Sequence, residues 1–182
     1  MAEEEPGNPC TGPSVLGQQR FIDDLIARTP TIKYIILDGL SFDPDPGYIT
    51  RLASRIAVFE KAGARVMVFT PHLRPDFDIR GCFSRPLHQA SHSCEGDAGE
   101  RRELTERFRP LASSISLSNP GVLFFDPNDL FCEDDRCRYV LDGLPAYRDE
   151  YHHLSEHASR LLADRFVAWA RANVAGLVSS DR

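Results

Sequence analysis

Apolar positions along the chain follow two periodicities, one typical of helices and one typical of buried strands. Residues 18–28 and 48–62 repeat apolar side chains at helical spacing. Runs 32–37 and 65–70 are short, β-branched and aromatic, a pattern that indicates strands buried on both faces. The order of strand, helix and strand predicts a βαβ unit with parallel strands covered by helices.

The second half of the chain continues the same pattern after an interruption. Residues 74–99 are rich in Pro, Gly, Ser and His, which predicts a long surface loop. A helix is expected over 100–115, kinked or split by Pro110. A third strand is expected at 121–126, and Ser155 is placed to cap a final helix.

The chain length and composition indicate one globular α/β domain. The 182 residues are 42% hydrophobic and 26% charged, which suits one sizeable core. We expect a flexible lead-in at 1–17, the domain at 18–178 and a tail at 179–182. The net charge of −6 argues against a nucleic-acid surface, which needs a concentrated basic face.

The sequence contains no membrane or export signal of its own. No apolar run approaches the roughly 20 residues that a spanning helix requires. The first residues are acidic and rich in Pro and Gly, unlike a signal peptide. A role outside the cytoplasm would therefore depend on a segment other than these residues.

Cysteine spacing favours a small disulfide-closed loop. Cys132 and Cys137 are separated by four residues, and a disulfide between them would indicate an oxidising compartment. Free thiols remain the alternative. A zinc site would need a second Cys-rich pair, which the sequence lacks.

The richest group of chemically active residues lies just before the final helix. Asp149 and His152 have the spacing D-x-x-H, and Glu150 and His153 have E-x-x-H. Serine hydrolysis and acyl transfer need an imidazole base and a carboxylate that holds its tautomer. The same residues could instead cap a surface helix. A metal site is disfavoured because no third ligand is evident.

The carboxyl half of the chain resembles a known family. The segments that carry the resemblance are 119–132, Cys137, 144–155 and 158–162, with looser similarity at 35–39 and 66–71. They are similar to the SGNH domain attached to family-3 membrane acyltransferases, the OafA-like O-acetyltransferases. The resemblance implies a three-layer α/β/α fold with a mainly parallel sheet, incomplete at the amino end.

The resemblance also implies an activity, partners and a location. The expected activity is O-acetylation of cell-envelope glycans by a Ser-His-Asp mechanism. The partners would be a glycan acceptor, an acyl donor and a membrane acyltransferase domain, outside the cytoplasmic membrane. No cofactor, metal ion or nucleic acid is expected. The alternative is a non-catalytic glycan- or partner-binding domain derived from the same fold.

The family pattern assigns the base but leaves its carboxylate partner open. His153, the histidine of His-Leu-Ser, matches the base of the family. Glu150 stands where the family has its usual aspartate, whereas Asp149 and His152 keep the D-x-x-H spelling. We therefore expect His153 as the base, with Asp149 or Glu150 as its orienting group and His152 as the other candidate base.

The nucleophile of the family has no clear counterpart in this sequence. The Gly-Asp-Ser block that carries it is missing. Ser14 follows no predicted strand, and Ser41 follows a strand that matches a later family strand. His72, His88 and His92 lie in or near the polar loop and are expected to face solvent.

Overall fold

A parallel three-stranded sheet is the centre of the fold. The computed structural model describes residues 13–83, 86–87, 89–90 and 93–178. The strands are β1 (Tyr34–Leu37), β2 (Arg65–Phe69) and β4 (Leu123–Phe125), in the order β1-β2-β4. Both pairings are parallel, so the predicted βαβ unit is confirmed.

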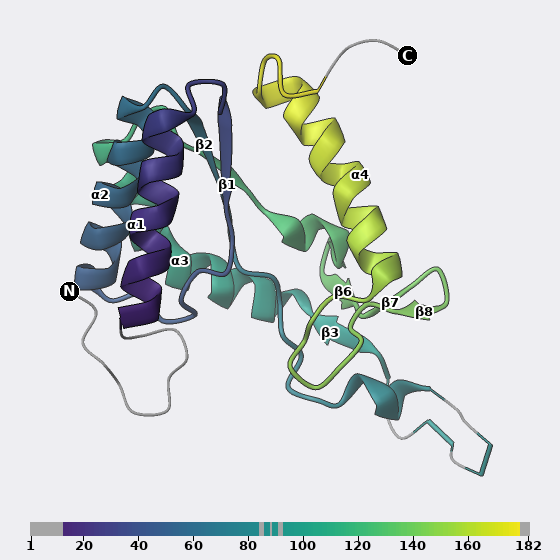
Figure 1. Cartoon of the computed structure of the whole chain (residues 1–182). Helices are drawn as coiled ribbons and strands as arrows, with labels where there is room; N and C mark the ends of the chain where they lie inside the picture. The colour runs from purple at the N-terminus through teal and green to yellow at the C-terminus, as the bar shows by residue number, and fades with distance from the viewer. Residues whose placement is uncertain (1–12, 84–85, 88, 91–92, 179–182) are drawn as a thin grey trace.

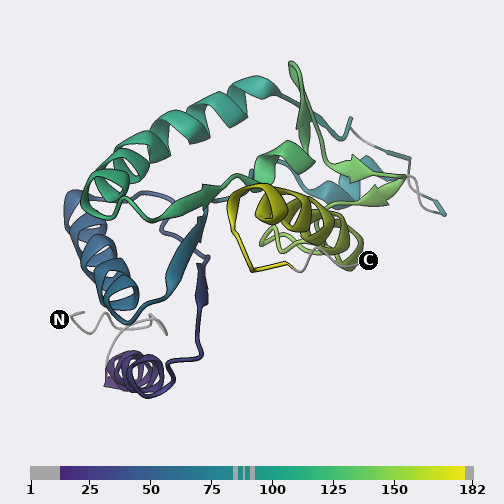
Figure 2. The same ribbon diagram turned by 90° about the horizontal axis from the view of Figure 1, so that it is seen from above.

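Helices cover both faces of this sheet, which gives three layers. They are α1 (Pro13–Arg28), α2 (Pro46–Lys61), α3 (Ala98–Ser118) and α4 (Glu156–Asn173). Figure 2 shows α2 and α3 on one face, α4 on the other, and α1 at the β1 end of the sheet. The expected α/β/α architecture is confirmed.

Alternation along β2 sends its side chains to two separate packing regions. Val66 and Val68 belong to the core formed with Ile56 and Phe59 of α2 and with the buried residues of α3. Met67 faces α4, where it packs with Ala170. Because both faces are covered, the strand consists of consecutive apolar residues.

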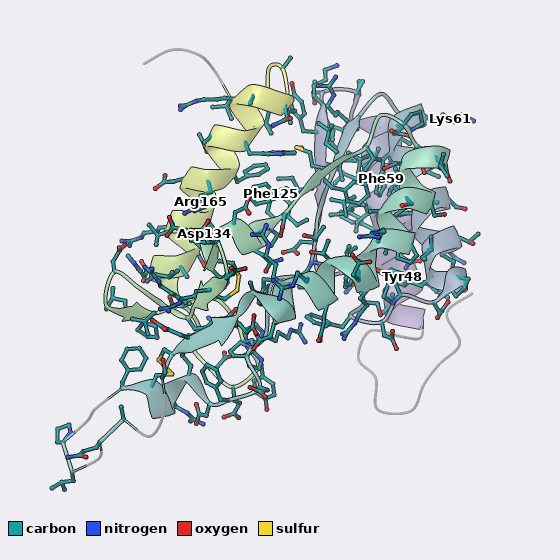
Figure 3. All side chains as sticks on the ribbon, turned by 180° about the vertical axis from the view of Figure 1, so that it is seen from behind. Tyr48, Phe59, Lys61, Phe125, Asp134 and Arg165 are labelled. Atoms are coloured by element: carbon teal, nitrogen blue, oxygen red, sulfur yellow. A yellow bond between two sulfur atoms is a disulfide. The ribbon has the colours of Figure 1, made fainter. Side chains whose placement is uncertain are left out.

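Aromatic rings connect the sheet to α4. The Phe125 ring lies 4.8 Å from Phe69 and 5.3 Å from Trp169, centroid to centroid. Phe166 completes the group. Figure 3 shows Phe125 between β4 and the helix. Such pairs contribute about 0.5–1.5 kcal/mol each beyond the area they bury, so they fix the position of the helix that follows the candidate site.

A small antiparallel subdomain lies beyond the carboxyl end of the parallel sheet (Figure 1). One sheet has the order β3-β6-β5, and β7 pairs with β8 in a hairpin. Disulfides join Cys132 to Cys137, as predicted, and Cys82 to Cys94, which the sequence did not predict. The strands are β3 (Glu95–Asp97), β5 (Cys132–Glu133), β6 (Arg136–Arg138), β7 (Val140–Leu141) and β8 (Leu144–Pro145).

Three sequence-based expectations need correction. Helix α1 begins at Pro13, so residues 13–17 are helical rather than lead-in; residues 1–12 and 179–182 lie outside the described residues. Helix α3 continues through Pro110, an exposed residue, so the helix is not split there. The 74–99 segment contains a short 3₁₀ helix at Ile79–Cys82 and strand β3, because a disulfide and pairing with β6 order it.

Across the described residues, every helix is too short or too polar to cross a membrane.

Candidate active site

A hairpin-like loop before α4 carries the cluster that the sequence predicted. The Ser155 N–H donates to the Ala146 carbonyl at 2.8 Å, and the Arg148 N–H donates to the His153 carbonyl at 2.9 Å. The Ser155 hydroxyl accepts from the Ala158 N–H at 3.1 Å, so the predicted helix cap is confirmed. These bonds close the loop at its base and place His153 beside the start of α4.

The Asp149 carboxylate binds both the side chain and the main chain of His153. The Asp149 Oδ2 atom lies 2.8 Å from His153 Nδ1, and Oδ1 accepts from the His153 N–H at 3.1 Å. The Tyr151 N–H and the Arg148 Nε–H donate to the same carboxylate at 3.1 and 3.2 Å. The carboxylate therefore fixes the orientation of the imidazole relative to the loop.

This pairing determines which His153 nitrogen can act as a base. A neutral imidazole donates from one nitrogen and accepts at the other. Because Nδ1 faces a carboxylate, the proton resides on Nδ1 and the basic lone pair on Nε2. The His153 side chain is 59% exposed, so Nε2 can be reached from solvent. The pair thus has the geometry of a base with its orienting acid.

The Asp149 carboxylate is expected to titrate unusually low. Partial burial acts in the opposite direction, but hydrogen bonds from the His153 ring and N–H, and from Arg148, lower the pKa of Asp149 from 3.8 to about 2. A pKa lowered by folding stabilises the protein above the unfolded value, and this contribution is lost as pH falls from about 4 through 2. Carboxyl ¹³C titration by NMR should give a midpoint near 2, which His153→Ala moves toward 3.8. A midpoint near 3.8 in the unmodified chain would contradict the pair.

Glu150 and His152, the other two candidate residues, have partners outside the Asp149–His153 pair. Glu150 forms an ion pair with Arg80 at 3.1 Å. The His152 ring is hydrogen-bonded through Nε2 to the Pro75 carbonyl at 2.9 Å. His152 has φ +61°, a left-handed conformation that turns successive side chains in different directions. The structure therefore brings Asp149 and His153 together and not Glu150 with either imidazole.

A cavity of about 290 Å³ lies beside His153. The carboxyl ends of all three parallel strands contribute to it, through Asp38 after β1, Thr70 after β2 and Pro127 after β4. Helix α4 adds Ser159. Ligands in open α/β folds bind at this edge of the sheet. Its position makes the cavity the candidate substrate site.

His72 lies in this cavity wall instead of facing solvent, contrary to expectation. The His72 ring is hydrogen-bonded through Nε2 to the His152 carbonyl at 2.9 Å. Burial lowers the pKa of His72 below 6.5, with a further decrease from Arg74, so the ring is neutral at pH 7. His88 and His92 lie outside the described residues.

Neither serine considered from the sequence lies beside His153. Ser41 forms hydrogen bonds with Asp43 and Tyr48, and Ser14 is in the first turn of α1. Ser159, which lines the cavity, was not anticipated because its sequence context shows only helical periodicity. Within the described part of the chain, no group of three or more His, Cys, Asp or Glu side chains could hold a metal ion.

Comparisons with known proteins point to one family. The family model described as the SGNH domain fused to AT3 domains matches residues 12–168. The match includes the three parallel strands, the cavity and the Asp149–His153 pair. A search of curated proteins found no matching relative.

Proposed function

Because this chain belongs to the SGNH domains that are fused to AT3 domains, we propose that it is the base-supplying part of an acyltransferase or esterase. The observation that carries the proposal is the Asp149–His153 pair, 2.8 Å apart, beside a cavity at the carboxyl ends of the parallel strands. The reaction we assign is O-acetylation of cell-envelope glycans.

In the proposed reaction, His153 transfers protons while Asp149 holds it in place. Nε2 accepts the proton of a serine hydroxyl as the oxygen attacks the acyl carbonyl, and Asp149 stabilises the resulting imidazolium. The imidazolium then gives this proton to the leaving group of the donor as the bond between the acyl group and the donor breaks. The acyl group is then carried on serine until the acceptor hydroxyl attacks it. Nε2 takes the proton of this hydroxyl and passes it to the serine oxygen as the serine ester breaks.

We place the missing serine on a strand from outside these 182 residues, paired with the free edge of β1. Among the described residues, β1 pairs only with β2. Parallel strands end at the same edge of a sheet, so a strand added parallel to β1 would end beside Asp38 and the cavity. This arrangement would bring a serine at its carboxyl end toward His153.

Exposed apolar side chains near β1 support this placement. Phe21 of α1 is 66% exposed, and Ile22, Leu25 and Ile36 are also exposed. Figure 2 shows α1 at the β1 end of the sheet. A further strand paired with β1 would lie next to this helix. Covering this surface would remove apolar area from water and pair the backbone groups of an edge strand.

The disulfides are consistent with work outside the cytoplasm, because such bonds persist in oxidising compartments. We propose that the domain acts on the outer side of the membrane beside a membrane acyltransferase domain, which would supply the acyl donor. The acceptor would be a glycan hydroxyl.

Turnover of p-nitrophenyl acetate by the purified chain tests the role of His153. The ester is reactive enough for an oriented imidazole, or a water that it activates, to release p-nitrophenolate without serine. We expect a rate above that of equimolar free imidazole, abolished in His153→Ala and lowered about tenfold in Asp149→Asn because the orienting carboxylate is lost.

A matched control makes the assay specific. Glu150→Gln removes a neighbouring carboxylate that binds Arg80 rather than His153, and should leave the rate unchanged. Turnover that persists in His153→Ala would reject the catalytic assignment and favour a glycan- or partner-binding domain.

A further inference from the structure

His72 links the end of β2 to the loop that carries His153. It follows Pro71, shortly after β2 ends at Phe69. Its Nε2 atom lies 2.9 Å from the His152 carbonyl oxygen. The ring stacks on Tyr147 with centroids 5.8 Å apart and planes at 29°. Since a carbonyl can only accept, Nε2 carries the proton and donates it.

The carbonyl that accepts this bond belongs to the peptide between His152 and His153. His152 itself has a left-handed φ, a conformation that costs a non-glycine residue free energy and needs support from its surroundings. The second support is the bond between the His152 ring and the Pro75 carbonyl. Both come from the segment after β2, so this segment fixes the turn from outside the loop.

We propose that His72 is a positioning residue for His153, acting through the His152 carbonyl. It holds the 152–153 peptide so that the imidazole stays paired with Asp149 and directed at the cavity. This inference rests on the proposed role of His153 as the base. The hydrogen bond, rather than the bulk of the ring, carries the effect.

Two substitutions separate the hydrogen bond from the ring. His72→Phe keeps an aromatic ring against Tyr147 and removes the donor. His72→Gln removes the ring but offers an amide N–H at about the position of Nε2. We expect His72→Phe to lose the hydrogen bond to the His152 carbonyl and His72→Gln to keep it.

NMR on the full chain measures the effect of each substitution on the Asp149–His153 pair and does not require catalytic turnover. In the wild type and in His72→Gln, long-range ¹H–¹⁵N spectra should show His153 protonated at Nδ1, and the Asp149 carboxyl midpoint should stay near 2. In His72→Phe the His153 tautomers should average and the Asp149 midpoint should rise toward 3.8. The proposal would be overturned if the spectra of His72→Phe matched those of the wild type. It would also be overturned if both variants lost the Nδ1-protonated form of His153.

The activated-ester assay separates this proposal from the role of His153. In His72→Phe the maximal rate should fall about tenfold with KM unchanged, the size expected for a lost hydrogen bond. If the NMR changes occur while the wild type shows no turnover, the positioning role stands and the catalytic role fails. If turnover depends on His153 but His72→Phe matches the wild type, the catalytic role of His153 stands and the positioning role of His72 fails.

Should His72→Phe not fold, the wild-type chain still provides a test. At pH 7 the His72 ring must be protonated at Nε2, which donates to the carbonyl. Observation of the Nδ1–H tautomer alone would refute the bond and with it the proposal.

Discussion

Replacing Tyr147 by alanine should lower the free energy of unfolding by about 3–5 kcal/mol, the range for deleting a buried aromatic side chain. Tyr147 is fully buried and contacts the rings of Phe131, Tyr139 and His72 at centroid distances of 5.7, 5.9 and 5.8 Å. The substitution leaves a cavity between the loop that carries His153 and the segment after β2. Urea denaturation followed by circular dichroism measures the change.

A matched variant separates ring packing from the hydroxyl. Tyr147→Phe keeps the ring contacts and removes only the O–H that donates to the Leu73 carbonyl. We expect a loss of about 1–3 kcal/mol, the cost of leaving one buried carbonyl unpaired. If Tyr147→Ala costs no more than Tyr147→Phe, the ring contacts do not hold the loop as described.

The central sheet and its helices could be predicted because their signals are local. The apolar runs of β1 and β2 mark strands covered on both sides, and the stripe through Ile56 and Phe59 marks the buried face of α2. Short connections then restrict the strands to parallel neighbours. Each step needs only residues that are close in sequence.

The antiparallel subdomain could not be predicted in the same way. Strand β3 consists of Glu95, Gly96 and Asp97, residue types that strands disfavour, and it exists because β6 pairs with it. The Cys82–Cys94 disulfide could not be predicted either, because a separation of twelve residues does not indicate which cysteines pair. Both features depend on contacts between distant segments.

The candidate site was narrowed by the sequence but not resolved. Residue types and their spacing identify residues 149–153 as the candidate catalytic cluster, but they leave four candidate residues there. The choice between them depends on the left-handed φ of His152 and on Arg80, which binds Glu150 from a distant segment. His72 was missed for the same reason, because its partner carbonyl lies 80 residues further along the chain.

Replacing Asn128 by alanine should cost about 2–6 kcal/mol and loosen the segment that carries His72. Asn128 is buried; its Oδ1 accepts from the Leu73 N–H at 2.8 Å and its Nδ2–H donates to the Pro71 carbonyl at 3.0 Å. Alanine leaves two buried backbone groups on either side of His72 unpaired, and each such group costs about 1–3 kcal/mol. Denaturant unfolding measures the total.

Hydrogen exchange locates the effect of Asn128. The Leu73 amide should exchange faster in Asn128→Ala, because its acceptor is gone. Asn173→Ala provides the control: its amide donates to Trp169 on the exposed side of α4, and its loss should change stability by less than about 0.5 kcal/mol. If the Leu73 amide stays protected from exchange in Asn128→Ala, Asn128 does not hold this segment in place. If protection is lost and the Asp149 midpoint rises as well, the segment after β2 supports the His153 turn through both Asn128 and His72.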